Sequence, residues 1–361
     1  MKKQTFLIFI FSLSLFYFGC NQPSTALNYD GSIISEDVDG NSRDMLIKGD
    51  TLIVVSEDEG LLIYKIKENL GENSMVLESI WADSASFHFY DWHPVQIQYS
   101  NLLDQILILD KFYSIQYSDL PDLIDEGFNA FDIVCCSLDN QHPSTFTVNH
   151  LDEKLEIFSL VRNVSDQEGI PNDIVSIYQI NLSKVPDSDI ILPEGVPIEV
   201  IDSLIYDATD IHYMNNSLFI SHTNYEQNDF RVYKRNDIGN PFSLDTTITT
   251  PFMQKVLYSN ELFLFVGMGE HGGVKIYNID SMEEVSWTAE GFTVRDIYWD
   301  LLSNKLLISC GYQGVIVLKL ADNMTVENSW VLTSSFAYAA RAYNEHVLVS
   351  TRNGIEIFKI Q

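Results

Sequence analysis

The sequence predicts an all-β fold made of repeated sheets, and three recurring features predict it. A glycine followed by alternating apolar residues returns along the chain, at residues 60–66, 273–279, 314–320 and 354–360. An aspartate recurs shortly before an apolar stretch, and a tryptophan recurs after the glycine-led segment. Alternation with a period of two is typical of a half-buried strand, and a unit that recurs at a regular spacing indicates a repeat architecture.

The glycine at the head of each copy predicts a tight turn with a positive φ, which glycine adopts without steric cost. Looser copies of the glycine-led strand occur at residues 114–117, 154–158 and 229–233. Five aspartates mark the start of a unit: Asp44, Asp91, Asp132, Asp210 and Asp296. Two further units carry Lys255 and Ala339 at the matching place, and the recurring tryptophans are Trp81, Trp287 and Trp330.

These start positions lie roughly 45 residues apart, which is the size of a four-stranded propeller blade. In each unit we expect a strand after the start position, a middle strand, the glycine-led strand and an outer strand with the tryptophan. The expected middle strands are residues 51–56, 105–109, 218–221, 262–266, 305–309 and 347–350. No segment has a sustained helical period with capping residues, so helix should be nearly absent. We therefore predict a seven-bladed β-propeller of four-stranded blades.

One interval does not fit this spacing. The step from Asp132 to Asp210 is nearly twice as long as the others. Either an eighth blade lies there, or the third blade carries an insertion around 162–206. Residues 174–180 alternate as a strand and follow 155–161 across a polar turn, which favours one long hairpin inserted into a seven-bladed ring. Eight blades is the alternative.

The two ends of the chain predict how the ring closes. The sequence stops directly after a glycine-led copy, so the last blade lacks an outer strand of its own. Residues 27–35 precede the first start position and can supply that strand. A ring closed in this way has no free sheet edge. We expect a single propeller domain over residues 29–361.

The first residues predict export. Lys2 and Lys3 precede an apolar run over residues 6–18 that is too short to span a bilayer comfortably, which is typical of a signal peptide over residues 1–19. Cys20 directly after Gly19 resembles a bacterial lipobox. The resemblance implies acylation of Cys20, a tether over 20–28, and lipid anchoring at the bacterial outer membrane or cell surface. The alternative is ordinary cleavage, which leaves a soluble secreted protein.

The charge of the chain limits its partners. The formal net charge is −30, which argues against nucleic acid and against lying flat on an anionic lipid surface, since both need a basic patch. Contact with a membrane is therefore expected only through the lipid anchor. Besides Cys20 the chain has Cys135, Cys136 and Cys310, which are too few for a disulfide framework.

The glycine-led strand, the start Arg295-Asp296-Ile297 and the middle strand together resemble the LVIVD-repeat β-propeller family. The best matches are residues 43–67, 254–282 and 295–320. The resemblance implies a propeller that is exported or displayed at the cell surface. It implies no settled activity.

The recurring aspartates are the first candidate site. In a ring, Asp44, Asp91, Asp132, Asp210 and Asp296 would form a circle, and carboxylates that converge on a central channel suit Ca²⁺, which takes oxygen ligands. The alternative is that each aspartate accepts backbone N–H groups at the turn into its strand. Repetition in five units favours this structural role. We predict no other cofactor.

The second candidate site is the densest group of aromatic and imidazole side chains: His88, Tyr90, Trp92 and His93. These residues, with His271 in a separate turn, predict a ligand pocket at one mouth of the ring. Ordinary packing between blades is the alternative, and it is favoured because aromatic residues are common in half-buried strands.

The sequence predicts a binding or scaffold module that recognises a protein or a glycan in the cell envelope, without catalysis. It contains no nucleophile elbow, phosphate loop, His-Glu-x-x-His or Cys-x-x-Cys motif. The alternative is a metal-assisted hydrolase or lyase at the channel mouth that uses the aspartates with His88, His93 or His271.

Overall fold

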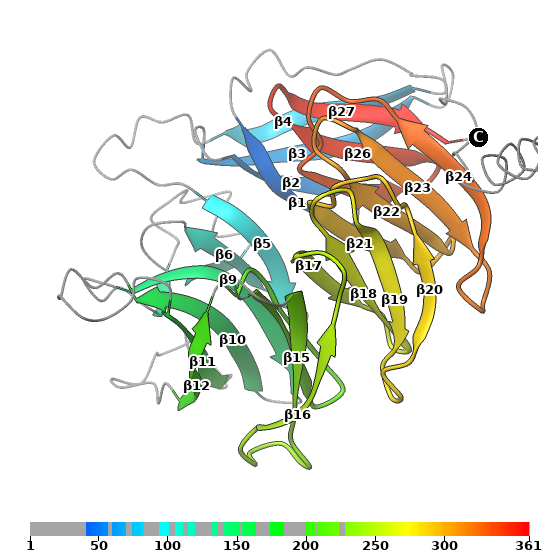
Figure 1. Ribbon diagram of the computed structural model, residues 1–361. Helices are drawn as coiled ribbons and strands as arrows, with labels where there is room; N and C mark the ends of the chain where they lie inside the picture. The colour runs from blue at the N-terminus through cyan, green and yellow to red at the C-terminus, as the bar shows by residue number, and fades with distance from the viewer. Residues whose placement is uncertain are drawn as a thin grey trace, which may run out of the picture.

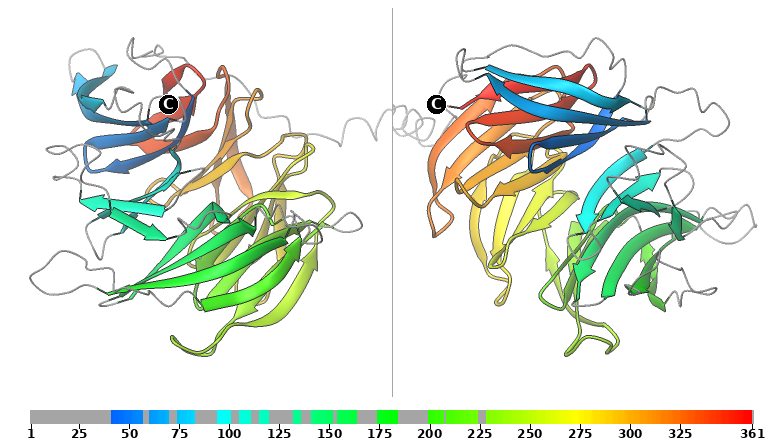
Figure 2. Two further views of the ribbon diagram at one scale, coloured as in Figure 1. Left: turned by 90° about the vertical axis from the view of Figure 1, so that its left-hand side faces the viewer. Right: turned by 180° about the vertical axis from the view of Figure 1, so that it is seen from behind.

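The computed structural model of the 361-residue chain describes residues 41–56, 60–69, 74–82, 94–100, 105–110, 115–119, 132–135, 141–151, 154–163, 174–183, 199–206, 208–223 and 228–360. The regular elements of these residues are all β-strands, so the prediction that helix is nearly absent is confirmed for this part of the chain. The same ranges hold no helix long and apolar enough to cross a membrane. Figures 1 and 2 show the strands gathered into sheets around a common centre.

The first half of the chain forms three sheets in which strands adjacent in sequence pair antiparallel. The first contains β1 (Ser42–Lys48), β2 (Thr51–Ser56), β3 (Gly60–Asn69) and β4 (Ser74–Ala82). The second contains β5 (Pro94–Ser100), β6 (Gln105–Asp110), β7 (Ile115–Asp119) and β8 (Asp132–Cys135). The third contains β9 (Gln141–His150), β10 (Lys154–Asn163), β11 (Ile174–Ser183) and β12 (Glu199–Tyr206).

The second half continues the same order of strands. The fourth sheet contains β13 (Ile211–Met214), β14 (Ser217–Thr223), β15 (Asn228–Lys234) and β16 (Ser243–Thr249). The fifth contains β17 (Gln254–Ser259), β18 (Phe263–Met268), β19 (Gly273–Asn278) and β20 (Glu284–Thr288). The sixth contains β21 (Asp296–Asp300), β22 (Lys305–Ser309), β23 (Val315–Leu320) and β24 (Val326–Leu332), and the last contains β25 (Ala339–Tyr343), β26 (His346–Thr351) and β27 (Gly354–Lys359).

The first strand of each sheet lies at the centre of a β-propeller. Each of β1, β5, β9, β13, β17, β21 and β25 contacts the next inner strand along the chain, and β25 contacts β1. The apolar cores lie between neighbouring sheets. One cluster joins Leu52 and Leu62 of the first sheet to Leu348 and Ile357 of the last, so these two sheets pack directly against each other.

The described residues give six four-stranded blades and one three-stranded sheet. The predictions of seven four-stranded blades and of eight are therefore both wrong in their count. The three-stranded sheet is β25–β27. The strand expected from residues 27–35 to complete it lies outside the described residues, as do the signal segment, Cys20 and the tether.

The third sheet corrects the assignment of strands between Asp132 and Asp210. Asp132 lies in β8, the outer strand of the second blade, and does not start a blade. The expected long hairpin is present, because β10 pairs with β11 over nearly their full length. It belongs to a regular blade, since the stretch around 162–206 supplies β11 and β12. The inner strand β9 carries threonines in place of the aspartate landmark, which explains why no start position is recognisable there from the sequence.

The turns before the glycine-led strands have the predicted geometry. Gly60, Gly273, Gly314 and Gly354 all have a positive φ, between 68° and 102°. At Gly314 a Cβ atom would lie 2.1 Å from the carbonyl oxygen of Leu332. The position therefore needs glycine both for its φ and for the close approach of the outer strand.

Candidate functional site: a polar channel lined by the inner strands

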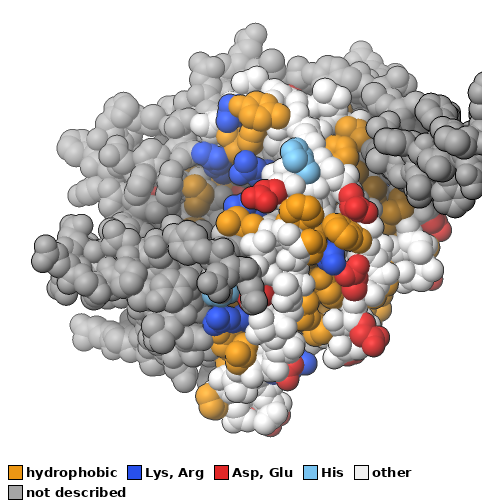
Figure 3. Space-filling view, viewed as in Figure 1, with side chains coloured by type: hydrophobic (Ala, Val, Ile, Leu, Met, Phe, Trp, Pro, Cys, Tyr) orange, Lys and Arg blue, Asp and Glu red, His pale blue; other side chains and the backbone are white. Residues whose placement is uncertain are grey.

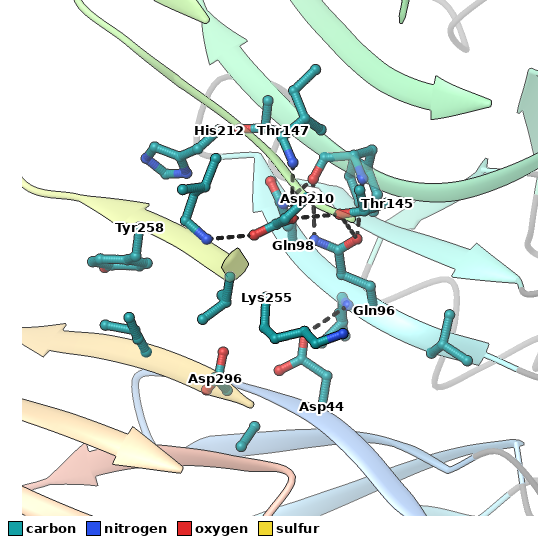
Figure 4. A pocket seen from close by; sticks show the side chains of 18 of the residues that line it. Asp44, Gln96, Gln98, Thr145, Thr147, Asp210, His212, Lys255, Tyr258 and Asp296 are labelled. Carbon is teal, nitrogen blue, oxygen red and sulfur yellow. Dashed lines mark hydrogen bonds between the residues drawn. The ribbon is translucent and has the colours of Figure 1, made fainter. Parts of the chain in front are cut away.

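The inner strands enclose a cavity of about 560 Å³ along the axis of the ring. Its walls come from every sheet, because residues in or beside β1, β5, β9, β13, β17, β21 and β25 line it. Figure 4 shows side chains of several of these strands converging on the cavity. The lining is mostly polar and includes both carboxylates and cations.

Asp44 ties its own strand to the next blade. One oxygen accepts the backbone N–H of Met45 at 2.8 Å, and the other accepts that of Ile97 in β5 at 3.2 Å. The first oxygen also accepts a hydrogen bond from Arg341 at 2.7 Å. The carboxylate of Asp44 therefore joins β25, β1 and β5.

Asp210 does the same between three other inner strands. Its Oδ1 accepts the backbone N–H of Ile211 at 3.0 Å and the hydroxyl of Thr145 in β9 at 3.0 Å. Its Oδ2 accepts the backbone N–H of Leu257 in β17 at 2.6 Å. The dashed lines in Figure 4 follow these bonds. The predicted structural role, acceptance of backbone N–H groups, is therefore present at Asp44 and Asp210, and it extends across the junction between blades.

Asp296 is held by an arginine from the last sheet. Arg341 donates to Asp296 at 2.7 Å on one side and to Asp44 at 2.7 Å on the other. These three side chains are only 15% to 22% exposed. One guanidinium thus pairs with two carboxylates, and it links the last sheet to both of its neighbours around the ring.

The other junctions between inner strands also carry polar contacts. Gln96 and Gln98 of β5 donate to the carbonyl of Phe146 in β9, at 3.1 and 2.9 Å. His212 of β13 hydrogen-bonds Ser259 of β17 at 2.7 Å.

The environment of the channel shifts the protonation of its lining. Burial raises the pKa of the Asp210 carboxyl to about 7, against the N–H donors that lower it. Burial also raises the pKa of Asp44 to about 6, and the nearby charge of Asp296 adds to the rise while Arg341 opposes it. For the imidazole of His212, burial lowers the pKa to about 4, so this ring is neutral near pH 7.

One end of the channel is lined by cations. Lys255 and Arg295 are exposed there, and neither side chain forms a hydrogen bond or ion pair with another described residue. Partial burial and the charge of Arg295 lower the pKa of Lys255. Arg43 also lines the cavity and lies 4.6 Å from the centre of the Tyr338 ring. Figure 3 shows Lys and Arg side chains gathered near the centre of this face, beside hydrophobic ones.

The structure brings together only part of the predicted site. Asp44, Asp210 and Asp296 line the cavity, whereas Asp132 belongs to the outer strand β8. Asp91, His88, Tyr90, Trp92 and His93 lie outside the described residues. His271 lies in the exposed turn between β18 and β19, where its Nδ1 is 3.0 Å from the carbonyl of Gly291, and it does not line the cavity.

The described carboxylates do not form the calcium site that one interpretation predicted. Among the residues that the structure describes, no three His, Cys, Asp or Glu side chains are grouped so as to hold a metal ion. Asp44 and Asp210 direct their oxygens at backbone N–H groups of neighbouring strands, and Asp296 faces Arg341.

Several lining residues were not singled out from the sequence: Gln96, Gln98, Thr145, Thr147, His212, Tyr258 and Arg341. The sequence feature that could have identified them is the alternation of polar and apolar residues within the inner strands. In Gln96-Ile97-Gln98, for example, Ile97 is buried between blades and the two glutamines line the cavity. Lys255 was recognised only as a departure from the aspartate pattern. That departure marks the cationic end of the channel.

Comparison with known proteins identifies the fold and nothing finer. No family model matches the sequence, and no curated protein matches it either. Among solved structures, the chain is similar to the computationally designed Ika8 protein, with 11% identity, a TM-score of 0.55, and coverage of 94% of this chain and all of that one. It is similar also to a chain of the mitotic checkpoint complex, with 9% identity, a TM-score of 0.55, and coverage of 95% and 97%. At these identities the likeness concerns the arrangement of the sheets alone: the chain has the β-propeller fold.

Proposed function

We propose that the protein is a binding or scaffold module that recognises a protein or a glycan in the cell envelope through the cationic end of its channel. The observation that carries this proposal is the pair Lys255 and Arg295, two exposed cations without a hydrogen-bonded partner among the described residues, beside a cavity of about 560 Å³. A cavity of this volume falls within the range of small-ligand pockets.

The hydrogen bonds that the channel carboxylates accept favour a binding function over the alternative, a metal-assisted hydrolase or lyase. A catalytic acid or metal ligand needs a carboxylate oxygen that can reach the substrate or ion. Both oxygens of Asp210 accept hydrogen bonds from the protein, and so do both oxygens of Asp44. These carboxylates act as bridges between blades.

Capture from an envelope extract tests the proposed function. We would immobilise the full chain with Cys20→Ser, which stays unacylated, and compare it with the same chain carrying Lys255→Glu and Arg295→Glu. The control is Lys319→Glu, at an exposed ion pair of β23 that does not line the cavity. We expect a protein or glycan retained by the parent and the control and lost from the double variant. Equal retention by all three chains, or by none, would contradict the proposal.

We also propose that Cys20 is acylated and anchors the chain to the outer membrane or cell surface, and that residues 27–35 complete the last sheet. The lipid anchor is proposed because Gly19-Cys20 follows a short apolar run, and the resemblance to the LVIVD-repeat family supports export. Labelling cells with an alkyne fatty acid should mark the wild-type chain and the Cys310→Ala variant but not Cys20→Ser. Label on Cys20→Ser would contradict the anchor.

A further inference from the structure

We infer that the cationic end of the channel binds a carbohydrate that carries a carboxylate, with the cations holding the carboxylate and neutral polar groups of the channel wall holding the hydroxyls. This inference rests on the proposed function and names the ligand class of the same site. Three features of the described residues carry it: unpaired cations, arginines fixed by aromatic rings, and a deeper wall with open neutral hydrogen-bonding atoms.

The clustering of cations runs against the composition of the chain. The protein has 21 Lys and Arg residues against 51 Asp and Glu, yet Arg43, Lys255, Arg295 and Arg341 all line one cavity. Burial lowers the pKa of Lys255, and the positive charge of Arg295 lowers it further, so the two cations repel each other. The charge of Glu270 favours the protonated lysine but forms no ion pair with it in the described structure. An anion between the two cations would offset the repulsion.

The carboxylates of the channel do not neutralise Lys255 and Arg295. Asp44 and Asp296 both pair with Arg341, further into the ring. Asp210 accepts two backbone N–H groups and a hydroxyl. Lys255 and Arg295 are therefore left to bind a ligand from outside the chain.

Aromatic rings hold the arginines of this face in place. Arg43 lies over Tyr338 at 4.6 Å, and Arg352 lies over Phe336 at 4.4 Å, while Arg295 is 5.9 Å from the same phenylalanine ring. A guanidinium stacked on a ring keeps its N–H groups at the edge of the plane. Such an edge suits the two oxygens of a carboxylate.

The deeper wall offers neutral groups that match hydroxyls. Gln98 donates its amide N–H to Phe146 and makes no described bond through Oε1. Thr147 accepts the N–H of Tyr213 at 3.3 Å, which leaves its hydroxyl proton to donate. His212, a neutral ring whose Nε2 hydrogen-bonds Ser259, and Tyr258 also line the cavity, as Figure 4 shows. An inorganic anion would need only the cations, and an acidic peptide would offer few hydroxyls. The cations at the end of the channel and the neutral groups of its deeper wall together therefore favour an acidic sugar.

Calorimetric titration tests the inference with three matched probes. The full chain with Cys20→Ser is titrated with trigalacturonate, with its methyl ester, which keeps the hydroxyls but lacks the charge, and with triglutamate, which keeps the charge on a peptide. We expect binding of trigalacturonate and at least tenfold weaker binding of the other two. Lys255→Gln with Arg295→Gln should weaken trigalacturonate at least tenfold, and Lys319→Gln should leave it unchanged.

Two further measurements separate the parts of the inference. Gln98→Met keeps the volume of the side chain and should weaken the binding of trigalacturonate. Inorganic phosphate, which needs only the cations, should bind the parent and this variant equally and weakly. Melting curves check that each variant is folded. Equal affinity for triglutamate or phosphate, or no effect of Gln98→Met, would overturn the carbohydrate assignment.

The outcome also distinguishes the two levels of the proposal. If no acidic sugar binds but an envelope component is still captured in a Lys255- and Arg295-dependent way, the ligand class is wrong and the binding function stands. If neither occurs, both are overturned.

Discussion

At Asp210 one carboxylate receives N–H groups or hydroxyls from three inner strands, β9, β13 and β17. Asp44 does the same for β25, β1 and β5. The recurrence of aspartate in the sequence was sufficient to predict that these residues share a role. It was not sufficient to show that the acceptor bonds cross between blades, because Ile97 and Leu257 lie far along the chain from the aspartates they bond.

The raised pKa of Asp210 gives the first prediction. The folded state binds the proton more tightly than the unfolded chain, whose value is 3.8, so this group's contribution to stability is fully present below about pH 4 and is lost as the pH rises to about 7. A single group changes the unfolding free energy by at most about 1.4 kcal/mol per pH unit in this window.

We would measure the unfolding free energy of the wild type and of Asp210→Asn in urea between pH 4 and pH 8. The difference, wild type minus variant, should fall from pH 4 to pH 7 and then level. Taking the difference removes His212, whose lowered pKa acts in the opposite direction: its contribution is present above pH 6.5 and is lost as the pH falls toward 4. If the difference in unfolding free energy stayed constant from pH 4 to pH 8, the pKa of the Asp210 carboxyl would not be raised in the folded state.

At the scale of the strand, the sequence predicted much of the detail correctly. The expected middle strands 51–56 and 305–309 have the bounds of β2 and β22, and Trp287 and Trp330 lie on the outer strands β20 and β24. These elements were predictable because a middle strand is buried on both faces, and a glycine with positive φ precedes the next strand. The third sheet was not predicted correctly, because its inner strand β9 has no aspartate and the outer strand β8 of the sheet before it has one.

The glycine-led turn gives the second prediction. Gly314 and Gly239 both have a positive φ, of 79° and 88°, but a side-chain carbon at Gly239 would meet no atom within 4 Å. Gly239→Ala should therefore cost only the backbone strain, about 1 kcal/mol, whereas Gly314→Ala should cost clearly more because it also displaces β24 from β23. Urea unfolding measures both. Equal losses would mean that the close approach of Leu332 is unimportant.

A buried ion pair between neighbouring blades gives the third prediction. Arg235, next to β15, donates to both oxygens of Glu156 in β10, at 2.8 and 2.5 Å, and these side chains are almost fully buried. Arg235→Met leaves the carboxylate of Glu156 without its cation and should cost about 3–5 kcal/mol. The adjacent Lys234 pairs with Asp245 at the surface, so Lys234→Met should cost under about 1 kcal/mol. Similar losses of unfolding free energy in the two variants would mean that the buried pair of Arg235 and Glu156 is no more important than the surface pair.

At the scale of the whole molecule, the six four-stranded blades and the three-stranded sheet form a ring in which the last sheet contacts both the sixth and the first. The fold class was predictable because the repeat unit sets the blade. The number of four-stranded blades was not predictable, because it depends on one irregular interval and on residues outside the described part of the chain. The channel could be predicted as a circle of aspartates but not as a cationic one, since Lys255 and Arg341 depart from the repeat.

Arg341 gives the prediction for the ring as a whole. Arg341→Leu leaves Asp44 and Asp296 facing each other without a cation, which should cost about 3–5 kcal/mol at pH 8. The cost should be smaller at pH 5, because burial raises the pKa of Asp44 to about 6 and this carboxyl takes up a proton there. Lys319→Leu breaks an exposed pair and should cost under about 1 kcal/mol at both values. A pH-independent loss in Arg341→Leu would contradict the paired arrangement.

The claim that the cationic end of the channel is the binding site is tested most directly by amide hydrogen exchange of the full chain carrying Cys20→Ser, with and without trigalacturonate. The account predicts slower exchange in β17 and in residues 293–297 and 336–341, which border the cations, and unchanged exchange in the outer strands β16 and β24. Protection confined to outer strands, or none at a saturating ligand concentration, would contradict it.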